Sequence, residues 1–194
     1  MMVKICGITN REDALAAVEA GASALGFNFY RESPRYISPT GASRIAAKIP
    51  STVWKVGIFV NETPETIARI ALDAGLDVAQ LYGTSEARGM RIWRAIQANE
   101  SLSVHMNDET AEAVLVDTPS DDLYGGTGAS FDWSRTKGLS KHVIIAGGLD
   151  AANVRRAIEQ SQPWGVDACS RLEKSPGLKD HDKVREFVKA ALRS

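Results

Sequence analysis

The chain has 194 residues, of which 44% are hydrophobic, and its formal net charge at pH 7 is −1. This length and composition predict one large domain with a sizeable core of its own. The near-neutral charge and the lack of a long basic run exclude a typical nucleic-acid or membrane-surface binder and favour a small-molecule partner. No apolar run approaches the roughly 20 residues that cross a bilayer, and no signal peptide is evident, so we expect a cytoplasmic protein.

The cysteines and histidines give no sign of a metal site. Cys6 and Cys169 lie at opposite ends of the sequence, in neither CxxC nor zinc-finger spacing. The histidines, at His105, His142 and His181, are scattered along the chain. We therefore expect neither a structural metal nor a disulfide scaffold.

Short apolar runs recur along the chain, and they are nearly continuous instead of alternating. This pattern is typical of parallel strands covered on both faces. The predicted strands are Val3–Cys6, Ala24–Phe29, Trp54–Val60, Val78–Tyr82, Leu102–Met106, Ala113–Asp117, His142–Ala146 and Gly165–Cys169.

Helical signals lie between these strands. Two apolar stripes repeat with helical spacing, namely Ile67, Ile70, Ala71 and Ala74, and Val184, Phe187, Val188 and Ala191. Thr63 precedes a proline at the predicted first position of a helix, and Asp150 and Asp180 are placed to accept hydrogen bonds from the free amides of the helices they open.

Eight strands alternating with helices predict an α/β fold, a single-domain (β/α)8 TIM barrel over residues 1–194. An open doubly wound sheet is the alternative. The first strand-to-helix turn reads Cys6-Gly7-Ile8-Thr9-Asn10 and lacks GxGxxG, so we do not expect a dinucleotide site there.

In a barrel the reactive residues lie at the carboxyl ends of the strands. Cys6 ends the first predicted strand and is a candidate base or nucleophile, although free cysteines are often simply buried. Asp117 ends the sixth, where burial favours a protonated general acid; a capping role is its ordinary alternative. Strand order places the two across part of the mouth from each other. Among cations, only Lys4 adjoins Cys6, and its direction is open.

Two anion sites are predicted around this pair. Glycines and polar residues in the loops after the seventh and eighth strands suit a phosphate, while Arg35, in the second loop, suits a substrate carboxylate. Gly126 lies in YGGTG (124–128), a loop placed to cover the site. The phosphate candidates are Gly147, Gly148, Ser170 and Arg171.

With these motifs in place, the chain resembles the phosphoribosylanthranilate isomerases of tryptophan biosynthesis over almost its whole length. The matching segments include KICGIT at 4–9, GFNFYRESPRYIS at 26–38, VDTPSDDLYGGTGASFDW at 116–133, IIAGGLDAANV at 144–154 and GVDACSRLEKSPGLKD at 165–180. The combination of KICG, YGGTG and AGGL is specific, whereas each motif alone is not.

The resemblance implies an Amadori rearrangement of N-(5-phosphoribosyl)anthranilate that needs no cofactor or metal. Asp117 would protonate the ring oxygen, and Cys6 would remove the C2 proton. Arg35 would hold the anthranilate carboxylate. The family commonly has histidine at Tyr82, and serine then glycine where this chain has Cys169 and Arg171.

Two hypotheses follow from these departures: Arg171 binds the phosphate directly, and Cys169 approaches Cys6 closely enough for an inactivating disulfide under oxidation. Two alternative functions remain open from the sequence. One is the related sugar isomerase of histidine biosynthesis, against which Cys6 and the lack of an evident repeat argue. The other is a non-catalytic phosphate-binding barrel, which would not need both Cys6 and Asp117.

Overall fold

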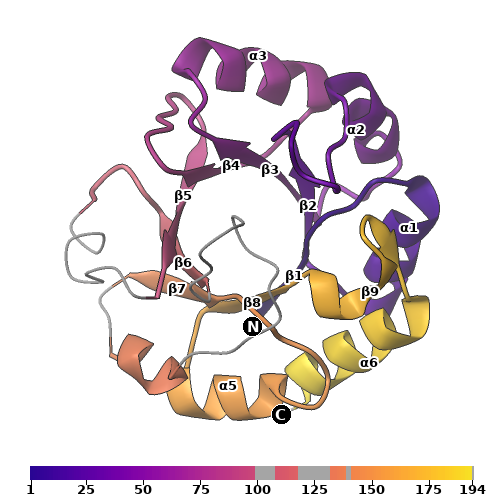
Figure 1. Ribbon diagram of the computed structural model, residues 1–194, viewed down its shortest axis with the longest axis vertical. Helices are drawn as coiled ribbons and strands as arrows, with labels where there is room; N and C mark the ends of the chain where they lie inside the picture. Colours follow the sequence, from indigo (N-terminus) through magenta and orange to yellow (C-terminus); the bar gives the residue numbers. More distant parts are fainter. Residues whose placement is uncertain (99–107, 118–131, 139–140, 194) are drawn as a thin grey trace.

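The computed structural model describes residues 1–98, 108–117, 132–138 and 141–193. Eight parallel strands in this part of the chain pair in sequence order and close into a barrel, which confirms the predicted fold class. The helices form a ring around it (Figure 1). The barrel strands are β1 (Met2–Ile5), β2 (Ala24–Asn28), β3 (Trp54–Val60), β4 (Val78–Tyr82), β5 (Arg91–Gln97), β6 (Ala113–Asp117), β7 (His142–Ile145) and β8 (Gly165–Ala168).

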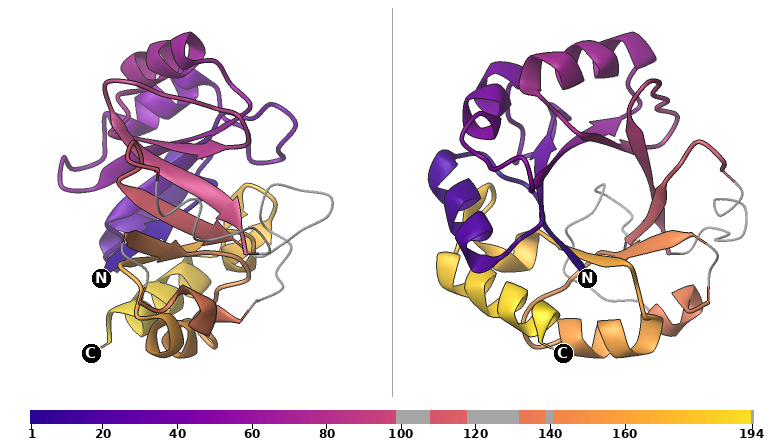
Figure 2. Two further views of the ribbon diagram at one scale, coloured as in Figure 1. Left: turned by 90° about the vertical axis from the view of Figure 1, so that its left-hand side faces the viewer. Right: turned by 180° about the vertical axis from the view of Figure 1, so that it is seen from behind.

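The remaining elements connect and cover these strands. All strands begin at the end of the barrel where the N-terminus lies, so their carboxyl ends form the opposite mouth (Figure 2). The α-helices are α1 (Arg11–Ala20), α2 (Pro39–Ala46), α3 (Pro64–Ala74), α5 (Val154–Ser161) and α6 (His181–Leu192); the short elements are η1 (Trp133–Thr136), η2 (Ser170–Leu172), β9 (Glu173–Ser175) and β10 (Leu178–Lys179).

The position of the fifth strand was predicted wrongly. Leu102–Met106 lies outside the described residues, and the place between β4 and β6 is taken by Arg91–Gln97. Arg91 and Arg94 interrupt the apolar run of β5, which hid the strand from a search for continuous hydrophobicity. The strict strand–helix alternation also fails here, because residues 83–90 contain no helix.

The other seven strands lie within one residue of their predicted bounds, and both apolar stripes lie on helices, α3 and α6. Thr63 and Asp180 accept amide hydrogen bonds at the starts of these helices, as predicted. Asp150 instead accepts from Ala152 and Asn153, in a turn that precedes α5. Asn153 occupies the capping position of that helix.

Side chains of the strands separate into two cores. Val3 and Ile5 of β1 pack outward against the helices, whereas Met2 and Cys6 join the cluster inside the barrel. Because successive strand residues face opposite sides, Lys4 points inward, and it is completely buried. Alternation therefore places a lysine inside the barrel, directly beneath the mouth.

Within the described residues, no helix is long and apolar enough to cross a membrane. The same residues contain no group of three or more histidine, cysteine or acidic side chains arranged to hold a metal ion.

Candidate active site

A pocket of about 630 Å³, its open mouth included, occupies the carboxyl end of the barrel. The predicted site residue Gly126 lies outside the described residues. All the other predicted site residues line this pocket: Cys6, Arg35, Asp117, Gly147, Gly148, Ser170 and Arg171.

Cys6 follows β1, and its amide donates to the carbonyl of Ala168 at 2.9 Å, which fixes it at the rim between β1 and β8. Gly26 on β2 leaves room for it, because a β-carbon there would lie 2.8 Å from the Cys6 sulfur. The buried Lys4 ammonium lies beneath Cys6 and interacts with it electrostatically. The interaction with Cys169 and burial raise the pKa of Cys6 well above its ordinary value, and the positive charge of Lys4 offsets this only in part.

Lys4 is held in place by Asp167, a pocket residue that the sequence analysis did not select. The two are paired across the β1–β8 register, and Lys4 Nζ lies 2.8 Å from Asp167 Oδ2. Burial alone would lower the pKa of Lys4, but the Asp167 carboxylate and Cys6 outweigh it and raise that pKa. Burial raises the pKa of Asp167 to about 7, although Lys4 opposes the shift. Its Oδ1 is buried and has no hydrogen-bond partner in the described structure.

Cys169 lies beside Cys6 at the same rim, as predicted. Each thiol affects the pKa of the other, and both cysteines are free. Gly7 (φ 74°) leaves room for Cys169 and Arg35, since a β-carbon there would lie 2.9 Å from the Cys169 sulfur and 2.8 Å from Arg35 Cδ. The disulfide remains a hypothesis about oxidising conditions.

Arg35 reaches the pocket from the loop after β2, and a second acid holds it there. Its Nε and Nη2 donate to the Glu173 carboxylate of β9, at 3.0 Å to Oε1 and 2.8 Å to Oε2. Lys179 of β10 also binds Glu173, at 2.9 Å from Nζ to Oε1. Two of the three guanidinium nitrogens thus fix Arg35, and among the described residues Nη1 has no hydrogen-bond partner.

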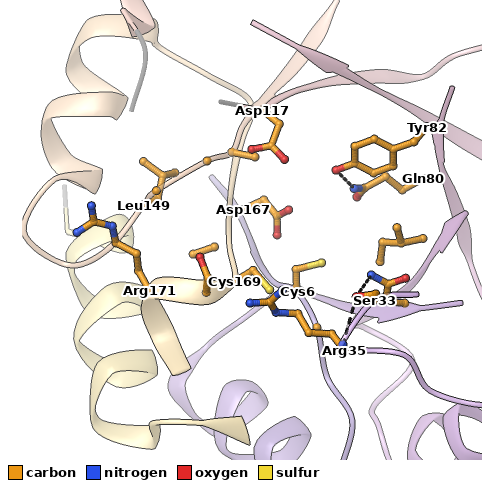
Figure 3. A pocket seen from close by; sticks show the side chains of 18 residues that line it. Cys6, Ser33, Arg35, Gln80, Tyr82, Asp117, Leu149, Asp167, Cys169 and Arg171 are labelled. Carbon is orange, nitrogen blue, oxygen red and sulfur yellow. Dashed lines mark hydrogen bonds between the residues drawn. The ribbon is translucent and has the colours of Figure 1, made fainter. Parts of the chain in front are cut away.

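Asp117 stands at the end of β6, is only 6% exposed, and faces the same space as Cys6 and Asp167 (Figure 3). Tyr82 of β4 borders this space, and its hydroxyl accepts from Gln80 Nε2 at 3.2 Å. Burial, reinforced by Asp117 and Cys6, raises the pKa of Tyr82 well above its ordinary value. Tyr82 is therefore a neutral phenol here.

The predicted phosphate loops converge on one side of the pocket. Gly147 and Gly148, after β7, have positive φ values of 86° and 64°, which glycine adopts without strain. Ser170 begins the short helix η2 directly after β8. A short helix following the eighth strand is a common phosphate-binding element of such barrels. Arg171, at the rim, pairs with Asp150 at 3.1 Å and keeps 45% of its side chain exposed.

Comparison with known proteins adds a family to this geometry. Residues 3–190 match the model of the N-(5'-phosphoribosyl)anthranilate (PRA) isomerase family. The protein named N-(5'-phosphoribosyl)anthranilate isomerase from Solibacter usitatus is 47% identical, with 98% of this chain and 97% of that protein covered. Its counterpart from Thermotoga neapolitana is 43% identical, with 97% of each covered.

Solved structures agree with the sequence comparison. The phosphoribosyl anthranilate isomerase of Thermotoga maritima superposes with a TM-score of 0.88 at 37% identity, covering 98% of each chain. An isomerase structure in complex with reduced 1-(o-carboxyphenylamino)-1-deoxyribulose 5-phosphate gives a TM-score of 0.84, again at 37% identity and 98% coverage of each chain. The barrel, the pocket and these relatives together place the chain in the N-(5'-phosphoribosyl)anthranilate isomerase family.

Proposed function

We propose that Cys6 and Asp117 are the general base and general acid of this pocket, acting on N-(5'-phosphoribosyl)anthranilate. Family membership supplies the activity: the chain is an isomerase of tryptophan biosynthesis that converts this substrate to 1-(2-carboxyphenylamino)-1-deoxyribulose 5-phosphate. The observation that carries the assignment is that a buried carboxyl and a thiol beside a buried ammonium face the same pocket from β6 and β1. General acid–base chemistry needs two such groups with different proton affinities.

The reaction proceeds in two proton transfers. Asp117 donates a proton to the ring oxygen of the sugar, the bond from that oxygen to C1 breaks, and the anthranilate nitrogen forms a protonated Schiff base with C1. The Cys6 thiolate then takes the proton from C2, and the electrons of that bond neutralise the Schiff base to give an enolamine. The enolamine tautomerises to the ketone.

Two anion sites orient the substrate for these steps. The compound bound in the relative's structure carries both a carboxylate and a phosphate, as its name states. We assign the phosphate to the amides around Gly147, Gly148 and Ser170, with Arg171 at the rim. The carboxylate goes to Arg35 Nη1, because Glu173 already binds the other two guanidinium nitrogens.

The two alternatives left open by the sequence are not retained. The family match and the relatives at up to 47% identity all carry the anthranilate isomerase name. A non-catalytic phosphate-binding barrel would have no use for Lys4 and Asp167 buried beneath Cys6.

The test is turnover of the phosphoribosyl substrate, followed by anthranilate fluorescence, in wild type, Cys6→Ala and Asp117→Ala. Loss of a general acid or base costs about 10²–10⁴-fold in rate. We expect losses of that order in kcat for both variants, with KM changed little. Near-normal kcat in either variant refutes its assigned role, and a wild type without turnover refutes the activity.

A further inference from the structure

Arg35 is held in place by the β9–β10 hairpin. Glu173 of β9 accepts from Arg35 Nε at 3.0 Å and from Nη2 at 2.8 Å, so its carboxylate meets one edge of the planar guanidinium with two hydrogen bonds. Arg35 lines the pocket beside the two cysteines (Figure 3), whereas Glu173 is not among the residues that line it. Glu173 therefore acts on a ligand through Arg35 and not by direct contact.

The Glu173 carboxylate is fully used within the protein. Its Oε1 also accepts from Lys179 Nζ at 2.9 Å and from the amide of Gly177 at 3.2 Å, and its side chain is only 4% exposed. Burial alone would raise the pKa of Glu173, but Arg35 and Lys179 outweigh it and lower that pKa. Glu173 is thus a fixed anion and not a further acid or base of the reaction.

Lys179 of β10 anchors Glu173 and is not itself placed to bind a ligand. Its side chain is completely buried, and besides Glu173 its Nζ contacts the Cys169 carbonyl oxygen at 3.2 Å and the Cys169 sulfur at 3.6 Å. An ammonium has three hydrogens to donate, and these three acceptors use them. Lys179 therefore serves to fix the acid that holds Arg35.

The hairpin that carries these anchors is itself fixed to the barrel. The amide of Lys179 donates to Asp13 Oδ2 of α1 at 2.8 Å. Gly177 (φ 81°) packs against the loop after β2, because a β-carbon there would lie 3.3 Å from the Pro34 carbonyl oxygen. The hairpin thus joins α1 to the loop that contains Arg35, and this sets the position of Glu173.

One edge of the Arg35 guanidinium is left over by this arrangement. A guanidinium carries five N–H donors in one plane, so a carboxylate bound at the edge formed by Nε and Nη2 leaves the edge with Nη1 for a second carboxylate. Among the described residues Nη1 has no hydrogen-bond partner. The side chain is therefore fixed in place by one acid and keeps its second edge for another.

We propose that Glu173 is a positioning residue that makes the pocket selective for a ligand with a carboxylate: Glu173, anchored by Lys179, holds Arg35 so that Nη1 meets that carboxylate. The inference deepens the proposed function and rests on the assignment of Arg35 to the substrate carboxylate. A ligand of the same shape without a carboxylate gains nothing from a fixed guanidinium. Glu173 therefore controls selectivity for the carboxylate and not affinity in general.

The test measures competitive inhibition by two compounds that differ only in the carboxylate. One is reduced 1-(o-carboxyphenylamino)-1-deoxyribulose 5-phosphate, and the other is reduced 1-phenylamino-1-deoxyribulose 5-phosphate. In wild type, a charge-assisted hydrogen bond should favour the first compound by about 10–100-fold. We expect Glu173→Gln, which keeps the size of the side chain but removes its charge, to lower this ratio about 10-fold and to leave inhibition by the second compound nearly unchanged. A Glu173→Gln variant with the wild-type ratio overturns the inference.

Asp13→Asn is the matched control. Asp13 is also a buried acid, and it holds the same hairpin through the amide of Lys179, but it has no hydrogen bond to Arg35 in the described structure. We expect this variant to lose unfolding free energy and to keep the wild-type inhibition ratio. If it lowers the ratio as much as Glu173→Gln does, the cluster is merely structural and the inference is overturned.

Arg35→Ala separates the inference from the function on which it rests. If Arg35→Ala abolishes the selectivity and Glu173→Gln keeps it, Arg35 binds the carboxylate without help from Glu173, and the positioning role alone is overturned. If Arg35→Ala keeps the wild-type ratio, the assignment of Arg35 to the carboxylate is refuted, and the inference is overturned with it.

A measurement on wild type covers the case in which Glu173→Gln fails to fold. The Nε–H signal of Arg35 in heteronuclear NMR spectra, identified by its loss in Arg35→Ala, reports whether this edge of the guanidinium is held. We expect the signal to be visible without ligand, because Nε–H donates to the buried Glu173. A signal that appears only when the carboxylated inhibitor binds would show that the ligand orders Arg35, and that result overturns the inference.

Discussion

The two ends of the barrel differ in their buried side chains, which are charged at one end and aromatic at the other. At the mouth, Lys4 and Asp167 are buried as a charged pair beneath a reactive thiol. At the other end, Trp54, Trp93 and Trp164 pack with ring centroids 5.6–5.9 Å apart and close the barrel with apolar surface. Aromatic burial stabilises a fold strongly, whereas a buried ion pair contributes little net stability against an apolar replacement. The mouth is therefore organised for chemistry and the closed end for stability.

The largest expected effect comes from Lys4→Met. The substitution leaves Asp167 buried without its partner and removes the cation beside Cys6. Breaking one side of a buried pair costs about 3–5 kcal/mol, so we expect that loss in the free energy of unfolding, measured with denaturant, and a large fall in kcat. Lys55→Met is the matched control, because Lys55 and Asp77 form a more exposed pair that is worth at most about 1 kcal/mol. Equal losses of unfolding free energy in the two variants would contradict the expected difference between the buried pair and the more exposed pair.

Trp93→Ala tests the closed end. Trp93 is fully buried inside the barrel, and truncating such a side chain costs about 3–5 kcal/mol through lost burial and a residual cavity. We expect this loss in the free energy of unfolding, with kcat of the folded enzyme unchanged at low temperature. A variant with normal stability and reduced kcat would show that the two ends are not separated in this way.

Arg171→Ala has a smaller expected effect, on binding alone. A hydrogen bond from a charged group is worth about 1.5–3 kcal/mol, and the partial exposure of Arg171 places it at the lower end, so KM rises about 10-fold. Steady-state kinetics should show an unchanged kcat. Arg155→Ala, on the exposed face of α5 and paired with Glu159, is the control. An unchanged KM in Arg171→Ala would contradict the proposed contact between Arg171 and the substrate phosphate.

A further prediction is a slope of stability with pH. The pKa of Asp167 is raised from its ordinary 3.8 to about 7 in the folded chain, so its contribution to stability is full below pH 4 and is lost as pH rises to 7. The loss proceeds at up to about 1.4 kcal/mol per pH unit. We expect the difference in free energy of unfolding, wild type minus Asp167→Asn, to fall as the pH rises across this window. A difference that rises with pH would show that the carboxyl is ionised throughout.

Sequence reasoning reached the barrel because apolar runs mark buried parallel strands. It missed β5, where Arg91 and Arg94 lie along the strand, and it left the direction of Lys4 open, because lysine is almost never fully buried unless it is paired. The sequence did contain a signal for the buried Lys4 pair. Closure of the barrel pairs β8 with β1, and in that register Lys4 lies opposite Asp167.

The predicted site residues within the described ranges all line one pocket, because each stands at a strand end or in the loop that follows. The Lys179–Glu173–Arg35 cluster could not be predicted. It depends on how the β9–β10 hairpin folds back on the loop after β2, and no local pattern encodes that contact.

The most direct test of the account is titration of thiolate absorbance in the ultraviolet, on wild-type protein without ligand. The interaction with Cys6, assisted by the charges of Lys179 and Arg35, lowers the pKa of Cys169 to about 7, so one thiolate should form with a midpoint near 7. The second should form only at alkaline pH, since the pKa of Cys6 is raised well above its ordinary value. Two thiols that both titrate near the ordinary value of 9.0 would contradict the claim that the fold organises this mouth for proton transfer.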